Sequence, residues 1–96
     1  MKATLIIRNR RLFEDGFLIE MVVWRVPVTV PPTSHEFKYR LFYGRKDERV
    51  VGYDNERGKG DHRHYGNREE PYAFSTMAQL LDDFERDVVA VRGEQI

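Results

Sequence analysis

Residues 36–44 read EFKYRLFYG, and apolar and polar side chains alternate along most of this stretch. A period of two is typical of a β-strand that has one buried face and one face in solvent. The face expected to be buried consists of Phe37, Tyr39, Leu41 and Tyr43. Lys38 and Arg40 would lie on the solvated face, and Phe42 falls outside the pattern. The stretch therefore predicts a half-buried strand on which a sheet can be built.

Three further strands are expected within residues 3–54. Residues 4–9 are short and apolar, and residues 17–30 form the longest apolar run, which is rich in β-branched side chains. Asp15-Gly16 supplies a tight turn between them, and Pro27 indicates a bend or an edge position. A polar hairpin at residues 44–48 would lead to a return strand over residues 49–54. Trp24, within the long apolar run, is interpreted as a core residue.

Residues 54–70 have the composition of a Gly/His-rich loop. Residues 54–68 contain three glycines and seven charged side chains, with no apolar face of helical or strand period. Within them, only residues 62–65 are considered as an extended piece. Gly58-Lys59-Gly60 has part of the composition of a phosphate-binding loop, but the Walker spacing and its hydroxyl residue are absent.

A single helix is predicted over residues 75–92. Its apolar stripe consists of Met77, Leu80, Leu81, Phe84, Val88 and Val91, which recur at three- and four-residue spacing. Ser75 or Thr76 can cap its start, and Thr76 with Gln79 fits the reciprocal capping pattern. Asp82 lies four residues before Arg86, a spacing that adds an ion pair to the exposed face. Gly93 is a natural end for the helix.

These elements predict an α+β fold in one domain, residues 1–96: a four-stranded antiparallel meander with one C-terminal helix packed on one face. The apolar content of 41% is enough for a core, which excludes wholesale disorder. The chain has no cysteine, which excludes disulfides and thiolate zinc sites. It also has no apolar run of about 18 residues that could span a membrane. We therefore expect a cytoplasmic protein that does not contact the membrane.

Charge is balanced over the whole chain but not along it. Lys+Arg and Asp+Glu number 16 each. Residues 38–68 carry nine basic and five acidic side chains, whereas residues 69–96 carry two basic and seven acidic ones. Such a chain can hold a polyanion on one side. An alternative that charge alone leaves open is that the two segments pair with each other.

The segment Asp61-His62-Arg63-His64-Tyr65 contains two of the three histidines. In an extended chain, His62 and His64 would share one face, and Arg63 and Tyr65 would lie on the other. Two close imidazoles resist carrying charge at the same time, so a neutral base and a charged acid become available together. This combination suits cleavage of RNA, which carries its own nucleophile in the ribose 2′-hydroxyl. Lys59, Arg63 or Arg57 would stabilise charge on the phosphorane.

Other interpretations of this segment stay open: contact with an acidic protein, a metal site, or a solvated loop without a task. A metal site would need ligands besides His62 and His64, and the candidates Asp54, Glu56, Asp61 and His35 have no diagnostic spacing. We therefore expect no metal and no cofactor. His35 itself is interpreted as an edge histidine without a task.

Three motifs within residues 36–92 resemble the TumE-like family of small bacterial proteins. They are Tyr53-Asp54-Asn55, the run from Gly58 to His64 that reads GKGDHRH, and Pro71-Tyr72 before the helix with Leu80-Leu81-Asp82-Asp83-Phe84. No motif was matched in the first 35 residues. The resemblance implies a toxin of a bacterial toxin–antitoxin pair, with a helix-turn-helix antitoxin as its partner.

Residues and resemblance together predict a toxin that acts as a metal-independent endoribonuclease, a hydrolase that binds and cleaves RNA. The alternative is a toxin or interaction module without catalysis that binds nucleic acid or protein through its basic face. The expected residues fall into three groups. The catalytic residues would be His62, His64, Arg63 and Lys59. RNA would be bound by Arg57, Lys59, Arg63, Lys38 and Arg40. Supporting roles would fall to Asp54, Asn55, Asp61, Tyr65 and Tyr72.

Overall fold

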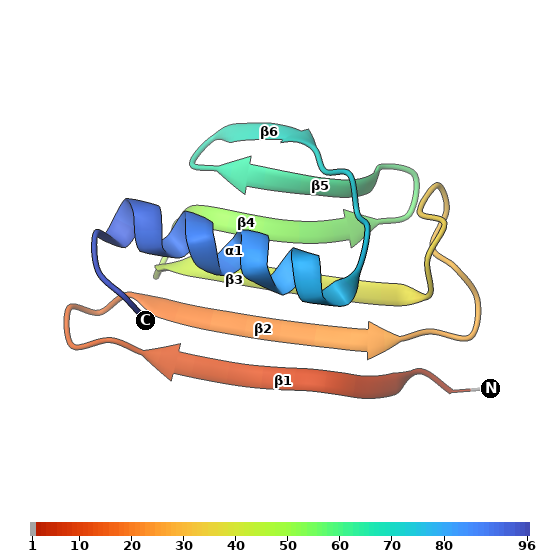
Figure 1. Cartoon of the computed structure of the whole chain (residues 1–96), viewed down its shortest axis with the longest axis horizontal. Coiled ribbons are helices and arrows are strands. Elements are labelled where there is room, and N and C mark those ends of the chain that lie inside the picture. The colour runs from red at the N-terminus through yellow and green to blue at the C-terminus, as the bar shows by residue number, and fades with distance from the viewer. Residues whose placement is uncertain (1) are drawn as a thin grey trace.

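The computed structural model describes residues 2–96, which form one six-stranded sheet and one helix. The strands are β1 (Thr4–Leu12), β2 (Leu18–Arg25), β3 (Phe37–Arg45), β4 (Glu48–Glu56), β5 (Gly60–Tyr65) and β6 (Arg68–Pro71). Each strand pairs with the next in the chain, and every pair is antiparallel. Helix α1 (Met77–Arg92) lies across one face of this meander (Figure 1). The predicted α+β class with a C-terminal helix on an antiparallel sheet is confirmed.

The predicted number of four strands is wrong, because residues 54–70 are not a loop. They contain the end of β4, the hairpin to β5, and all of β5 and most of β6. Burial alternates along β5, where Gly60, His62 and His64 are buried and the residues between them are half-buried. The alternating buried side chains of β5 are imidazoles rather than aliphatic groups, so a search for apolar periodicity missed this strand.

The core lies between the sheet and α1. Tyr39, Leu41 and Tyr43 are almost fully buried there, as the alternation in residues 36–44 predicts. They pack in the same cluster as Phe84 and Leu80 of the helix. Each large side chain buried in this way contributes roughly 1.5–3 kcal/mol relative to exposure. This cluster fixes which face of the sheet the helix covers.

The helix ends follow the predicted capping signals. Thr76 is the N-cap, and its hydroxyl accepts a hydrogen bond from the Gln79 amide at 3.1 Å. Gly93 caps the other end in the left-handed conformation at φ 80°. The Asp82–Arg86 pair forms at 3.0 Å on the exposed face. Of the predicted stripe, Val91 is the exception, because it is 55% exposed.

The opposite face of the sheet is not covered by the helix, and we call it the open face. Trp24 lies on it and is 36% exposed, so its interpretation as a core residue is wrong. The neighbouring Val23 takes the buried position, and alternation along β2 directs Trp24 the other way. The strand prediction for residues 17–30 is also too long, because β2 ends at Arg25, two residues before Pro27. Lys38 and Arg40 lie on the open face as predicted, each beside a β2 residue of that face.

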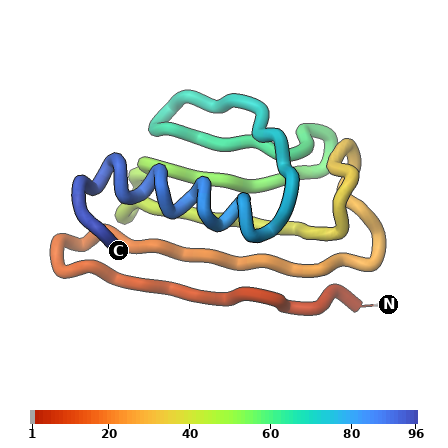
Figure 2. Tube along the Cα trace, viewed as in Figure 1, coloured from red at the N-terminus to blue at the C-terminus, as the bar shows by residue number. Residues whose placement is uncertain are grey.

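The connection between β2 and β3 packs against β5. The Thr33 hydroxyl donates to Asp61 at 2.6 Å, and the His35 ring lies 2.6 Å from the other oxygen of the same carboxylate. The His35 ring also stacks on Phe74, with 3.8 Å between ring centroids. His35 is therefore not an edge residue without contacts, because it joins this connection to β5 and to the segment before the helix. Figure 2 shows that last segment running from β6 to the start of α1.

Candidate functional site

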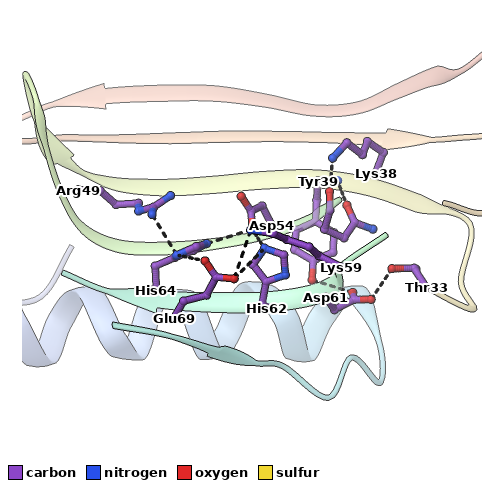
Figure 3. Close-up of polar contacts among 11 residues, drawn as sticks. Thr33, Lys38, Tyr39, Arg49, Asp54, Lys59, Asp61, His62, His64 and Glu69 are labelled. Carbon is purple, nitrogen blue, oxygen red and sulfur yellow. Dashed lines mark hydrogen bonds and ion pairs between the residues drawn. The ribbon is translucent and has the colours of Figure 1, made fainter. Parts of the chain in front are cut away.

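His62 and His64 lie on the open face and converge on one carboxylate, that of Asp54. Register places Asp54 directly opposite His62 and Gly52 opposite His64. The Asp54 Oδ1 atom is 3.0 Å from His62 Nε2 and 3.3 Å from His64 Nε2. The two ring centroids are 5.2 Å apart, with the rings nearly perpendicular (Figure 3). The alternation of β5 therefore brings together the pair that the sequence predicts.

The hydrogen bonds of His64 define its tautomer. Arg49 Nη2 lies 3.0 Å from His64 Nδ1, and a guanidinium can only donate. Nδ1 therefore presents its lone pair to Arg49, and the single ring proton sits on Nε2, which faces Asp54. In this tautomer, His64 points its ring proton toward Asp54.

His62 differs from His64 in having an unbonded nitrogen. Its Nε2 is buried, and it has no hydrogen-bond partner among residues 2–96, although Asp54 Oδ1 is close. A buried polar atom without a partner is uncommon and marks a candidate functional group. The two histidines are therefore not equivalent: His62 has a free nitrogen, and His64 has a positioned proton.

Glu69 of β6 lies over both imidazoles. Its carboxylate is 3.6 Å from His64 Nδ1 and 3.9 Å from His62 Nε2. Lys59, at the end of the β4–β5 hairpin, approaches the same carboxylate at 3.7 Å. The Glu69 side chain is 43% exposed, whereas those of the histidines are 5% and 6% exposed. An anion thus lies at the entrance to the pair, on a side chain far more exposed than either imidazole.

Gly52 makes room for Arg49 beside His64. A Cβ atom built at Gly52 would lie 2.7 Å from the Arg49 side chain. Because no side chain is present there, the Arg49 guanidinium can cross β4 and reach the imidazole. The contacts of Arg49 and Glu69 with the pair were not predicted. Both contacts depend on strand register: Arg49 reaches the pair from β4, and Glu69 reaches it because β6 pairs with β5.

Asp54, His62 and His64 also have the composition of a metal site. One ligand atom from each lies within 4.8 Å of the others. Two imidazoles and a carboxylate suit a divalent transition metal. Of the ligand candidates drawn from the sequence, Asp54 alone meets the pair in this group, because Asp61 and His35 contact each other on the other face of β5.

Several predicted site residues lie on the helix side of the sheet, away from the pair. Arg63 donates to Glu70 at 2.6 Å, and Tyr65 donates to Asp87 at 2.8 Å. Asn55 is fully buried, and its side chain bonds to the β3 backbone. Asp61 belongs to the Thr33–His35 cluster, and Tyr72 donates to Asp83 at 2.6 Å. These residues support the fold around the pair without contacting the imidazoles.

Four tyrosines, Tyr39, Tyr53, Tyr65 and Tyr72, share a chemical pattern, a hydroxyl that donates to a carboxylate. Burial, with a hydrogen bond to Asp61, raises the pKa of Tyr39 well above its usual value. Burial and Asp87 do the same for the pKa of Tyr53, and burial and Asp83 for the pKa of Tyr72. Burial also raises the pKa of Tyr65. Tyr53, Tyr65 and Tyr72 therefore bond as neutral hydroxyls to carboxylates of α1, whereas Tyr39 bonds to Asp61 within the sheet.

Four of the five cations expected to bind RNA lie in two places, because Arg63 is on the helix side of the sheet. Lys38 and Arg40 lie on the open face, where they line a hollow of about 410 Å³ together with Asp54. Arg57 is exposed in the β4–β5 hairpin, two residues before Lys59. The open face therefore presents basic side chains beside the histidine pair.

The comparison with known families agrees with the family resemblance that the sequence motifs within residues 36–92 indicate. The family described as Toxin TumE matches residues 2–92. The chain belongs to the toxin TumE family. Membership in TumE makes it a toxin component of a toxin–antitoxin system and implies an antitoxin partner. The TumE match includes the first 35 residues, in which no motif was recognised.

No curated protein and no solved structure matches the chain. Within residues 2–96, no helix is long and apolar enough to cross a membrane.

Proposed function

We propose that this TumE-family toxin cleaves RNA, and that His62 and His64 are its catalytic residues. The observation that carries the proposal is the convergence of both imidazoles on Asp54, on the face that the helix leaves open. An unbonded nitrogen and a positioned ring proton lie side by side, which is the combination that general base and general acid catalysis require.

The roles follow from the hydrogen bonds. His62 Nε2 removes the proton from a ribose 2′-hydroxyl, and the oxygen attacks the adjacent phosphorus. When Arg49 turns from His64 Nδ1 to the bound phosphate, His64 takes up a second proton at Nδ1. The resulting imidazolium gives its Nε2 proton to the leaving 5′-oxygen as the phosphorus–oxygen bond breaks. The products are a 2′,3′-cyclic phosphate and a 5′-hydroxyl, and one proton has moved to His62 while another has left His64. Asp54 positions both rings.

The scissile phosphate would take the place of the Glu69 carboxylate. That carboxylate lies within 4 Å of nitrogens of both rings and of Lys59. A position that holds a carboxylate between a lysine and two imidazoles also suits a phosphate, because both groups are anions that accept hydrogen bonds. Arg49 and Lys59 then stabilise the charge of the phosphorane. Arg63 has no part in this mechanism, because it lies on the other face of β5.

The test is cleavage of RNA by purified His62→Ala and His64→Ala variants. Each should lose roughly 10²- to 10⁴-fold in rate, the usual contribution of one acid–base group. Asn67→Ala, an exposed position in the β5–β6 turn, is the matched control and should cleave normally. Thermal unfolding of all variants separates loss of chemistry from loss of fold. Full activity of both histidine variants would exclude acid–base catalysis at this site.

A metal-dependent reaction is the second candidate, favoured by the three-ligand geometry of Asp54, His62 and His64. It predicts that EDTA abolishes cleavage and that added Mn²⁺ or Zn²⁺ restores it. The histidine mechanism predicts full cleavage in EDTA. If no cleavage occurs with or without metal, while the toxin still binds its target, the non-catalytic binding toxin remains.

We also propose that the antitoxin is a helix-turn-helix protein, as the resemblance implies. The gene next to this one should encode it, and co-expression should restore growth. A neighbouring gene of another class that neutralises the toxin would contradict this.

A further inference from the structure

Two cross-strand rows of side chains form a hollow on the open face, next to the histidine pair. One row carries Trp24 and Lys38, with Glu56 beyond them, and the other carries Val22, Arg40 and Asp54. The hollow has a volume of about 410 Å³. Asp54 both lines the hollow and contacts the histidine pair, so the hollow adjoins the proposed catalytic site.

The charges of the hollow balance. Lys38 and Arg40 oppose Asp54 and Glu56, so the hollow as a whole offers no net attraction to a phosphate or to an acidic peptide. Its floor includes Val22 and Trp24, and Trp24 is 36% exposed. A flat, neutral group with polar edges fits such a wall better than an ion does. Nucleobases have this chemistry, and they stack on indole rings.

Cations outside the hollow fit the phosphates on either side of a bound base. Arg8 of β1 pairs in register with Val22, and Arg10 pairs with Glu20. On the other side, Arg49 and Lys59 flank the histidine pair. The open face therefore places cations on both sides of the hollow that holds Trp24, as expected for a surface that binds single-stranded nucleic acid.

We propose that this hollow is a nucleobase subsite in which the base of a nucleotide adjoining the cleaved bond stacks on Trp24. Glu56 accepts a hydrogen bond from an exocyclic amino group of that base. Carboxylates accept from the amino group of cytosine in this way. Adenine and guanine also carry an amino group, and uracil has none. The subsite therefore favours amino-bearing bases over uracil, and its role in cleavage rests on the proposed function.

Trp24 is the single tryptophan of the chain, so its fluorescence reports on this hollow directly. The ligands are 2′-O-methyl octamers of cytosine, adenine and uracil, which cannot be cleaved because the 2′-hydroxyl is blocked. We expect the cytosine and adenine octamers to quench Trp24 emission at lower concentration than the uracil octamer. Equal quenching by all three would overturn the role of Glu56, and no quenching by any of them would overturn the subsite.

Variants test the two contacts separately by anisotropy of labelled octamers. Trp24→Ala should weaken binding of every octamer by roughly 5- to 100-fold, the usual cost of losing one stacked base. Glu56→Ala should abolish the preference for cytosine over uracil. Leu12→Ala is the control, because Leu12 is an exposed apolar residue of the same sheet outside the hollow. Loss of binding in this control equal to that of Trp24→Ala would contradict stacking.

Failure of this proposal is distinguishable from failure of the ribonuclease proposal. Quenching without RNA cleavage would leave the subsite standing and reject the enzyme. Cleavage that depends on His62 and His64 without quenching would reject the subsite and keep the enzyme. If the antitoxin changes Trp24 emission and no octamer does, the hollow is a protein contact and the nucleobase proposal is overturned.

Discussion

At the scale of single residues, the difference between His62 and His64 comes from what contacts each ring. Arg49 requires a lone pair on one nitrogen of His64, and Asp54 then faces the proton on the other. His62 has the same carboxylate nearby but no hydrogen bond at Nε2. Identical side chains two positions apart therefore have different proton-transfer capacities, because their neighbours on β4 differ.

Glu69 gives the sharpest prediction at this scale. Glu69→Gln removes the negative charge over the two imidazoles, so RNA binding should strengthen. One exposed charge interaction is worth up to about 1 kcal/mol, which corresponds to an affinity gain of roughly two- to fivefold. Anisotropy of a labelled, uncleavable oligonucleotide measures it.

Glu85→Gln is the matched control, because it makes the same charge change at an exposed position on α1, across the sheet from the pair. Equal strengthening in both variants would show that net charge, rather than the position of Glu69, is responsible. Weaker binding of the Glu69 variant would show that this carboxylate helps to hold RNA.

At the scale of elements, the contrast is between α1 and β5. Helix α1 was predictable in extent and capping, because its apolar stripe and its caps are local signals. Strand β5 was not, because its buried side chains are Gly60, His62 and His64. What stabilises β5 is pairing with β4 and β6 and the contact of Asp61 with the β2–β3 connection, all of which depend on distant residues.

The helix start allows a paired test of stability. Thr76→Ala removes the hydroxyl that accepts from the Gln79 amide, so the free energy of unfolding should fall by about 1 kcal/mol. Ser75→Ala, one residue earlier, should change it by less than about 0.5 kcal/mol, because Ser75 is exposed and is not the cap. Urea unfolding followed by circular dichroism measures both. A larger loss in the Ser75 variant would contradict the cap assignment.

At the scale of the whole molecule, the sheet has two faces with different chemistry. The helix side is closed by apolar packing and by tyrosine hydroxyls bonded to carboxylates. The open face carries the histidine pair, Asp54 and the basic side chains. The four acidic residues of α1 therefore lie across the sheet from the basic groups of the open face, rather than against them (Figure 1).

The tyrosine contacts predict how stability depends on pH. In the unfolded chain, tyrosines lose their protons near pH 10. In the folded chain, the raised pKa values of Tyr39, Tyr53, Tyr65 and Tyr72 keep these hydroxyls protonated at higher pH. Their stabilisation is thus complete below about pH 10 and falls as the pH rises further, because the unfolded state releases protons that the folded state retains.

Urea midpoints measured between pH 8 and pH 11.5 should therefore fall above about pH 10. Absorbance at 295 nm should show these four tyrosines ionising together with unfolding. Ionisation of all four at pH 10 in a chain that stays folded would contradict the assignment.

The sequence by itself determined the α+β class, the helix with its caps, the buried face of β3 and the placement of His62 and His64 on one face of a strand. Each of these depends on a period or on a residue pair close together in the chain, so local chemistry is enough. Only the tertiary structure decided that β5 and β6 are strands, that Trp24 is exposed and that Arg63 lies away from the histidines. It also brought Asp54, Arg49 and Glu69 to the pair, because they come from the neighbouring strands β4 and β6 and meet the imidazoles only through sheet register.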